Sequence, residues 1–293
     1  MLYSILIPSF NNLKYLKLLI KSINLNSNFS HELIVHVNDG SDGTLDFVKK
    51  NKIKFTHSSS NIGLCSAINL AASKATKNYL LYAHDDMYFC PMWDKFLKKE
   101  VQNIGHDNFY LSGTMIEPNS GHIKFNAGES FETFDEHKLL INLDNLNFFD
   151  HQGSHFAPHL ISKSLWIDIG GFSEEFNPGD GSDPDFNMKL WKKGVRIFKG
   201  INDFKVYHFS SVTIRKNRNL TINNGHKIFL KKWGISIKFF TKFFLHGCIT
   251  SNKTLICNKY DGPLQGPTVN FTYLVELFRD KLYFVYLKMI NYK

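Results

Sequence analysis

Short apolar runs alternate with helically spaced segments over the first 86 residues. The runs that predict strands are residues 3–8, 32–37, 53–57 and 78–83. The segments that predict helices are residues 13–23, 44–50 and 65–75. In the first of these, Leu16, Leu19, Ile20 and Ile23 recur at the spacing of one helix face. Strand and helix therefore alternate four times, which predicts a mostly parallel α/β sheet with helices on both faces.

Polar residues follow the end of each predicted strand. In chain order they are Ser9 with Asn11, Asp39 with its Gly-Ser, Asn61 with Gly63, and Asp85 with Asp86. Each group alone is a common turn. Ligands of such sheets bind at the carboxyl ends of the strands, so we expect these groups to converge. An acidic pair among them supplies the oxygen ligands that hard divalent cations prefer.

A second acidic segment follows Gly170-Gly171-Phe172. Asp183 and Asp185 precede a helical pattern that ends at Gly194, and either carboxylate is able to cap that helix. If Asp185 lies inside the helix, Asp183 is either its cap or the residue that projects into a site. Between residues 105 and 165 no period is clear, and we expect irregular structure with a few short strands.

The order of these motifs resembles that of family-2 glycosyltransferases of the GT-A fold. The resemblance covers residues 3–235 and rests on Ile7-Pro8-Ser9, Asn38 to Ser41, Asn61 to Gly63, Asp85-Asp86, Gly170 to Phe172, Ser182 to Asp185, His208 and Lys232-Trp-Gly. It implies a GT-A (Rossmann-like) catalytic domain over residues 1–215. Its nucleotide-sugar half would be about 1–105 and its acceptor half about 106–215. Residues 216–293 would form a basic, mainly helical extension.

The same resemblance implies an inverting, metal-dependent hexosyltransferase that uses a nucleotide-diphosphate sugar, with uridine as the expected base. Asp86 would ligate Mn²⁺ or Mg²⁺, with His208 as a second ligand. His84 stands where another acid is frequent, which excludes a site of three carboxylates. The expected nucleotide-binding residues are Pro8, Ser9, Asn11, Asp39, Asn61, Gly63 and Asp85, with Asp39 at the base and Asp85 at the ribose.

The resemblance also places the catalytic base and the acceptor. Asp183 would take the proton from the acceptor hydroxyl. Ser182 replaces the Glu that is common in the family, so Asp185 stays an alternative base. Gly171, His159 and Trp191 are the expected acceptor-binding residues, and the acceptor would be a glycan or a lipid-linked saccharide.

Three histidines, His151, His155 and His159, recur at the spacing of a helical zinc set. Gly153 and Pro158 interrupt the run, so we expect no zinc site there.

The net charge of +9 is confined to one part of the chain. Residues 205–293 carry 15 Lys and Arg against three Asp and Glu. Within them, lysines alternate with aromatic residues between Lys227 and Phe244, which indicates either solvated basic faces or attachment to an anionic membrane surface. Arg215, Lys216 and Arg218 are alternative diphosphate contacts. No nucleic-acid motif is present, so we expect no nucleic acid as partner.

The remaining features bear on the compartment and on rival functions. Four scattered cysteines predict no disulfide framework, the first apolar run ends at Pro8, and no run of about 18 apolar residues occurs. We therefore expect a cytoplasmic protein, at most peripheral on a membrane.

A sugar-phosphate nucleotidyltransferase would carry a Gly-rich loop after the first strand, where Ser9-Phe-Asn-Asn has no glycine. An inactive homologue that binds glycans or a partner is the non-enzymatic rival.

Overall fold

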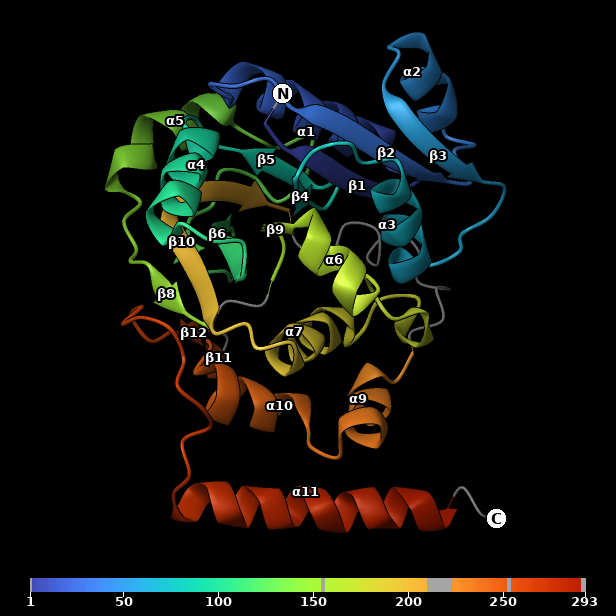
Figure 1. The fold of residues 1–293 in the computed structure, drawn as a ribbon. Coiled ribbons are helices and arrows are strands. Elements are labelled where there is room, and N and C mark those ends of the chain that lie inside the picture. Colours follow the sequence, from blue (N-terminus) through green and yellow to red (C-terminus); the bar gives the residue numbers. More distant parts are fainter. Residues whose placement is uncertain (1, 154–155, 210–222, 252–253, 291–293) are drawn as a thin grey trace.

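The structure, a computed structural model, describes residues 2–153, 156–209, 223–251 and 254–290 (Figure 1). Its first part follows the order that the sequence predicts. The elements are β1 (Ser4–Phe10), α1 (Leu13–Asn26), β2 (Glu32–Asn38), α2 (Thr44–Lys50), β3 (Lys54–Ser58), α3 (Leu64–Ser73) and β4 (Tyr79–Tyr82). The predicted α/β class, with a mostly parallel central sheet and helices packed against it, is confirmed.

Helix α1 illustrates how the apolar pattern determines packing. Leu16, Leu19, Ile20 and Ile23 are all buried, as their spacing predicts. Strand β1 pairs in parallel with both β2 and β4, and Phe10 lies opposite Asn38 at the end of the β1–β2 ladder. The loops that carry the polar groups therefore leave the same edge of the sheet.

The second part of the chain completes the sheet. Its elements are β5 (Met87–Phe89), α4 (Trp93–Ile104), β6 (Phe109–Glu117), β7 (Ile123–Lys124), α5 (Glu136–Asn142), η1 (Leu143–Asn145), β8 (His151–Gln152), β9 (His159–Ser162), α6 (Lys163–Ile169), η2 (Glu174–Phe176), α7 (Ser182–Lys192) and β10 (Ile197–His208). The strand order is β3-β2-β1-β4-β9-β6-β10-β5, with β7 beside β6 and β8 beside β10. Strand β9 runs antiparallel to both β4 and β6.

The expectation of irregular structure between residues 105 and 165 is wrong for β6. All nine of its residues are buried, so it is a central strand covered on both faces. Its polar Thr114 obscures the apolar run in the sequence. The Thr114 hydroxyl donates to the carbonyl of Ile201 at 2.8 Å, where the pairing of β6 with β10 shifts register between Ile201 and Lys205. The buried hydroxyl therefore satisfies a backbone acceptor at the bulge.

The C-terminal extension is largely helical, as predicted. It contains α9 (Gly225–Trp233), α10 (Ile237–Phe240), the π-helical turn η3 (Thr241–Leu245), β11 (Ile249–Ser251), β12 (Thr254–Ile256) and α11 (Phe271–Ile290). Phe229, Phe239, Phe240 and Phe243 are buried in the same core as the sheet. The aromatic residues that a membrane-binding face between Lys227 and Phe244 would need on the surface therefore face inward. The domain boundary at residue 215 stays a prediction.

Helix α11 lies across the base of the molecule, below α9 and α10 (Figure 1). In the part of the chain that the structure describes, no helix combines the length and the apolar character needed to cross a membrane.

The cysteine prediction is wrong for one pair. Cys248 and Cys257 form a disulfide, with their Cα atoms 4.1 Å apart, and the β11–β12 hairpin lies between them. The two cysteines are nine residues apart, and this spacing alone does not predict the hairpin that brings them together. The sequence therefore did not predict this disulfide. Cys65 and Cys90 are buried thiols. The expectation of a cytoplasmic protein therefore loses the support that it drew from the cysteine pattern.

Candidate active site

Asp85 joins the ends of β1 and β4. Its carboxylate accepts hydrogen bonds from the Ser9 hydroxyl at 2.7 Å and from the Asn12 side-chain amide at 3.0 Å. Asp85, Ser9 and Asn12 are all buried. Pro8 lies one residue earlier in β1. The structure therefore brings the predicted ribose-binding residue together with Ser9, a predicted nucleotide-binding residue, and with Asn12, which was not predicted.

Asp39 occupies a tight turn after β2. The Asn11 side-chain amide donates to Asp39 Oδ2 at 2.7 Å, and the Ser41 hydroxyl donates to the same oxygen at 3.0 Å. These hydrogen bonds, from Asn11 first, lower the pKa of Asp39, so its carboxylate stays charged. Gly40 has a φ of +81°, and a Cβ there would lie 2.6 Å from Val37 Cγ1. The Asp-Gly-Ser motif is thus required by the turn itself.

Asn61 and Gly63 shape the start of α3. The Gly63 N–H donates to Asn61 Oδ1 at 3.0 Å. The remote Asn177 Oδ1 accepts from the Cys65 N–H at 2.9 Å, and a Cβ on Gly63 would lie 2.4 Å from that oxygen. Asn177 belongs to the loop between η2 and α7. The start of α3, at the Asn-x-Gly motif, is therefore connected to the loop that precedes Asp183.

His208 and Asp86 meet because β5 pairs with β10. Met87 lies opposite His208 in that antiparallel pair, which places the preceding residue, Asp86, beside the histidine. His208 Nε2 lies 3.3 Å from Asp86 Oδ1, and Nδ1 donates to Glu117 Oε1 at 2.6 Å. All three side chains are buried. The imidazole is thus held between two carboxylates.

His84 completes this group. Potential ligand atoms of His84, Asp86 and His208 all lie within 4.8 Å of one another. Burial lowers the pKa of His84 to about 4, so its ring is neutral at pH 7. Burial alone would also lower the pKa of His208, but Asp86 and Glu117 outweigh it and raise the value to about 10. The position therefore stabilises positive charge, and one carboxylate with two imidazoles fits Mn²⁺ better than Mg²⁺, which prefers oxygen ligands.

The sequence analysis missed His84 and Glu117. His84 was treated only as the absence of an acid, although a histidine next to an acidic pair is itself a metal-ligand signal. Glu117 ends β6, a strand that the sequence pattern did not reveal. A carboxylate that holds the far nitrogen of a ligating histidine fixes the orientation of the ring.

Asp183 and Asp185 have different environments. Asp185 is buried and accepts hydrogen bonds from the Ser173 hydroxyl at 2.6 Å and the Trp233 indole at 2.8 Å. Its Oδ1 also lies 2.9 Å from Lys232 Nζ. Neither aspartate caps α7, because the N-cap residue is Gly181. Asp185 is thus a structural anchor between α7 and α9.

The Asp183 side chain is only partly exposed, and its Oδ1 is shielded from solvent with no hydrogen-bond partner among the residues that the structure describes. Burial raises the pKa of Asp183 to about 7. A carboxyl with this pKa exchanges a proton near neutral pH, as a general base requires.

Tyr82 connects Asp183 with the histidine group. Its ring lies 5.3 Å from the ring of His84. Burial, followed by the charges of Asp183 and other neighbours that include Asp86, raises the pKa of Tyr82 well above its usual range. The Tyr82 hydroxyl therefore stays protonated at neutral pH.

The three predicted acceptor residues have different surroundings. His159 is buried among Tyr82, Tyr110 and Phe186, and burial lowers its pKa to about 3. The Gly171 carbonyl accepts a hydrogen bond from Lys189. Trp191 packs against Phe240 and Phe244 of the extension and under the Arg196 guanidinium. The structure gives Trp191 a packing role, and an acceptor contact for Gly171 or His159 stays a prediction.

The histidine run at 151–159 is not a helix in the described residues. His151 belongs to β8 and His159 to β9, while His155 lies outside the described residues. Arg215, Lys216 and Arg218 also lie outside them.

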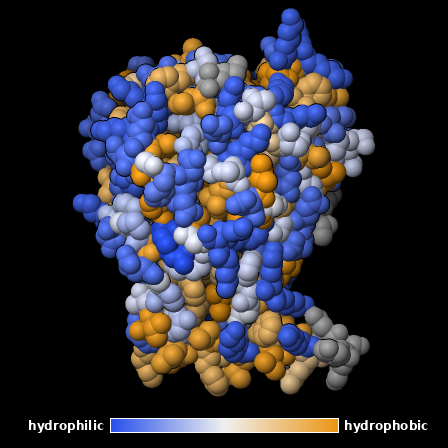
Figure 2. Space-filling view, in the orientation of Figure 1, coloured by the Kyte–Doolittle hydropathy of each residue, from blue (hydrophilic) through white to orange (hydrophobic). Residues whose placement is uncertain are grey.

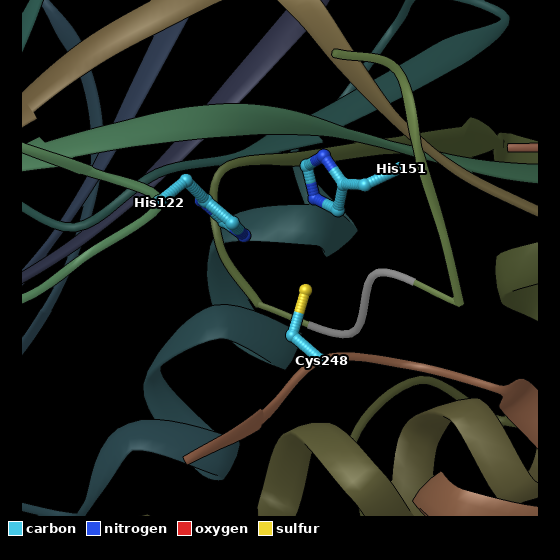
Figure 3. A group of neighbouring side chains, drawn as sticks. All are labelled: His122, His151 and Cys248. Carbon is cyan, nitrogen blue, oxygen red and sulfur yellow. The ribbon is translucent and has the colours of Figure 1, made fainter. Parts of the chain in front are cut away.

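His151 instead converges with His122 and Cys248 (Figure 3). Two of these three are engaged in other bonds. His122 Nδ1 accepts from the Met115 N–H at 2.9 Å, which leaves the ring proton on Nε2, and Cys248 is in the disulfide. The ring centroids of His122 and His151 lie 4.2 Å apart. We interpret this group as packing between the sheet and the extension.

The pattern that defines Glycosyl transferase family 2 matches residues 4–159. Over 237 residues the chain is 24% identical to chondroitin synthase of Pasteurella multocida (strain Pm70). The match covers 70% of this chain and 24% of that protein, so the chain spans about a quarter of its relative's length.

Solved structures show the same fold. Residues 1–349 of S. aureus TarS give a TM-score of 0.54 at 19% identity, covering 72% of this chain and 61% of that one. The complex of the same TarS region with UDP-GlcNAc gives 0.52 at 20% identity, with the same coverage. GalNAc-T7 with UDP, GalNAc and Mn²⁺ gives 0.55 at 13% identity, covering 71% of this chain and 44% of that one.

The two aspartates of α7 should respond oppositely to replacement. Asp185→Asn breaks the ion pair with Lys232 and should lower the free energy of unfolding by about 2 to 4 kcal/mol. Asp183→Asn should raise it by about 2 kcal/mol at pH 8, because the unfolded state ionises above about pH 4 while the folded carboxyl resists ionisation until about pH 7. Denaturant unfolding at pH 5 and pH 8 measures both. The increase in the free energy of unfolding caused by Asp183→Asn should be smaller at pH 5 than at pH 8. A decrease at pH 8 would contradict the raised pKa of Asp183.

Proposed function

Because the chain belongs to Glycosyl transferase family 2, we propose that it is an inverting transferase that moves a sugar from a UDP-sugar onto an acceptor hydroxyl. The observation that carries this proposal is the largely buried His84–Asp86–His208 group, in which His84 and Asp86 flank Asp85 just after β4, and whose two imidazoles and carboxylate place potential ligand atoms within 4.8 Å of one another. Asp183, a carboxyl whose pKa burial raises to about 7, supplies the proposed base. The complexes of the TarS region with UDP-GlcNAc and of GalNAc-T7 with UDP and Mn²⁺ support the choice of donor and metal.

The donor nucleotide lies along the ends of β1, β2 and β4 in this proposal. Asp39, fixed by Asn11 and Ser41, accepts hydrogen bonds from the base. Asp85 exchanges part of its bonding with Ser9 and Asn12 for the ribose hydroxyls. Both carboxylates are already oriented by neighbouring side chains, so little side-chain order is lost on binding.

The proposed chemistry is a single displacement. Mn²⁺ held by His84, Asp86 and His208 would neutralise charge on the departing diphosphate. Asp183 removes the proton from the acceptor hydroxyl while the hydroxyl oxygen forms a bond to the anomeric carbon of the donor sugar. The bond between that carbon and the diphosphate oxygen breaks at the same time. Attack from the face opposite the leaving group inverts the anomeric configuration.

We also propose that the acceptor is a glycan or a lipid-linked saccharide of polysaccharide assembly. The similarity to a chondroitin synthase supports this choice. The proposed donor half is residues 1–105 and the proposed acceptor half is residues 106–215.

Donor binding should depend on the metal and on Asp86. A UDP-sugar at 100 times its Kd, with Mn²⁺, should stabilise the protein by about 2.7 kcal/mol, and EDTA should remove the effect. Asp86→Ala should lose the stabilisation, whereas Asp183→Asn should retain it and lose transfer. Thermal shift and product formation across UDP, GDP, dTDP and CMP sugars measure these outcomes. Wild-type transfer by both variants would overturn the site.

Glu117 should act through His208. Glu117→Gln removes the charge that orients the imidazole, so Mn²⁺ affinity should fall about 10- to 100-fold. A Mn²⁺ titration followed by calorimetry measures the change. Glu129→Gln, at an exposed acid of the following loop, is the matched control and should leave the affinity unchanged. Equal effects of both variants would contradict a positioning role for Glu117.

Transfer should rise with pH through the pKa of Asp183. The base is protonated and inactive below about pH 7, so kcat/KM should increase towards a plateau above that value. Initial rates between pH 5 and pH 9 at saturating Mn²⁺ test this. A limb with an apparent pKa near 4 would show that another carboxylate is the base.

A further inference from the structure

The outward face of α11 is apolar along the whole helix. The exposed apolar residues that form this stripe are Phe271, Leu274, Val275, Phe278, Leu282, Val285, Tyr286 and Met289, and Tyr283 is exposed beside them. At helical spacing the residues of the stripe fall within about one third of the circumference. Figure 2 shows hydrophobic side chains gathered over this base of the molecule. Other exposed apolar side chains of the described residues, such as Ile167 and Leu25, stand on separate helices.

The polarity of α11 is inverted relative to a helix that faces water. Both acids of the helix point toward the protein. Glu276 pairs with Lys242 at 2.7 Å, and Asp280 accepts from the Ser236 N–H at 2.7 Å. Tyr273 packs against Phe239, with ring centroids 4.9 Å apart. These contacts fix which side of α11 faces outward, so the exposed stripe is a property of the folded chain.

Basic residues border the apolar stripe. Arg279 lies on one edge, and Lys281 and Lys288 lie on the other; all three are exposed. Asp280 is turned inward, and Glu276, which pairs with Lys242, also lies 3.8 Å from Arg279 through its second carboxylate oxygen, so Lys281 and Lys288 are the bordering residues without an acid of the helix paired to them in the described chain. Residues 205–293 as a whole carry 15 basic against three acidic residues. The partner that this face fits is therefore apolar and anionic at once, and the surface of an anionic bilayer offers both along the whole length of the helix.

We propose that α11 lies in the plane of an anionic lipid bilayer, with its apolar stripe among the acyl chains and Arg279, Lys281 and Lys288 at the lipid headgroups. A helix with an apolar face edged by basic residues binds such an interface. This surface differs from the stretch between Lys227 and Phe244, whose aromatic residues are largely buried. Attachment through α11 depends on neither donor binding nor transfer.

The test is flotation of the full chain with vesicles. Wild-type protein should float with vesicles that contain 30% phosphatidylglycerol in phosphatidylcholine, and should float much less with phosphatidylcholine alone or at high salt. Phe278→Glu with Leu282→Glu should lower the bound fraction at least about tenfold, because two charges enter the stripe. Replacing Arg279, Lys281 and Lys288 by Gln should weaken binding by about fivefold per residue on the anionic vesicles.

The matched control is Ile167→Glu, since Ile167 and Phe278 are equally exposed, at 65%, on different helices. It should float like the wild type. Thermal unfolding and UDP-sugar binding should be unchanged in all variants, so failure of attachment and failure of the proposed function are distinguishable. Three results would overturn the proposal: wild-type protein that stays soluble with anionic vesicles, equal flotation of the Phe278→Glu/Leu282→Glu variant, or a dimer in solution that this variant dissociates.

Discussion

Buried carboxylates must be compensated, and this constraint organises the edge of the sheet. Asp85 is held by the hydroxyl and amide donors of β1 and its following loop. Asp86 and Glu117 share one imidazolium between them. Asp185 has a lysine, an indole and a hydroxyl. Asp183 is the exception, because nothing in the described chain donates to its shielded oxygen, and its raised pKa is the result. The acids that have hydrogen-bond or ion-pair partners thus stabilise the surrounding structure, and Asp183 lies within that structure without such a partner for its shielded oxygen.

Much of the first half was predictable, because its local patterns agree with its tertiary contacts. The apolar spacing of α1 and the turn chemistry at Asp39 and Gly63 each have one physical solution, and the structure adopts it. The convergence of Ser9, Asn11, Asp39 and Asp85 followed from the rule for parallel strands. In the second half, β6 carries polar residues inside a doubly covered strand, so period alone does not identify it.

The site residues that the sequence did not predict depend on strand pairings between segments far apart in the sequence. Glu117 reaches His208 only because β6 and β10 are neighbours, and His84 acquires its role only when β5 pairs antiparallel to β10. The choice between Asp183 and Asp185 required knowing that Trp233 and Lys232 from α9 lie over one of them. The extension was misjudged for a related reason. Its lysine and aromatic pattern indicates an amphipathic surface, but the aromatic side packs into the same core as the sheet. The exposed apolar face belongs to a later helix, α11.

The Asn177 side chain has a consequence for how the two halves behave together. Its carbonyl oxygen receives the Cys65 N–H at the start of α3, its amide donates to Ser66, and its own backbone belongs to the loop that leads into α7. Gly63 is the residue that leaves room for it. A displacement of the turn at Gly63 would therefore be passed through Asn177 to the loop that leads into α7. On the proposed function, this contact would link donor binding to the position of Asp183, and the link would act equally in both directions.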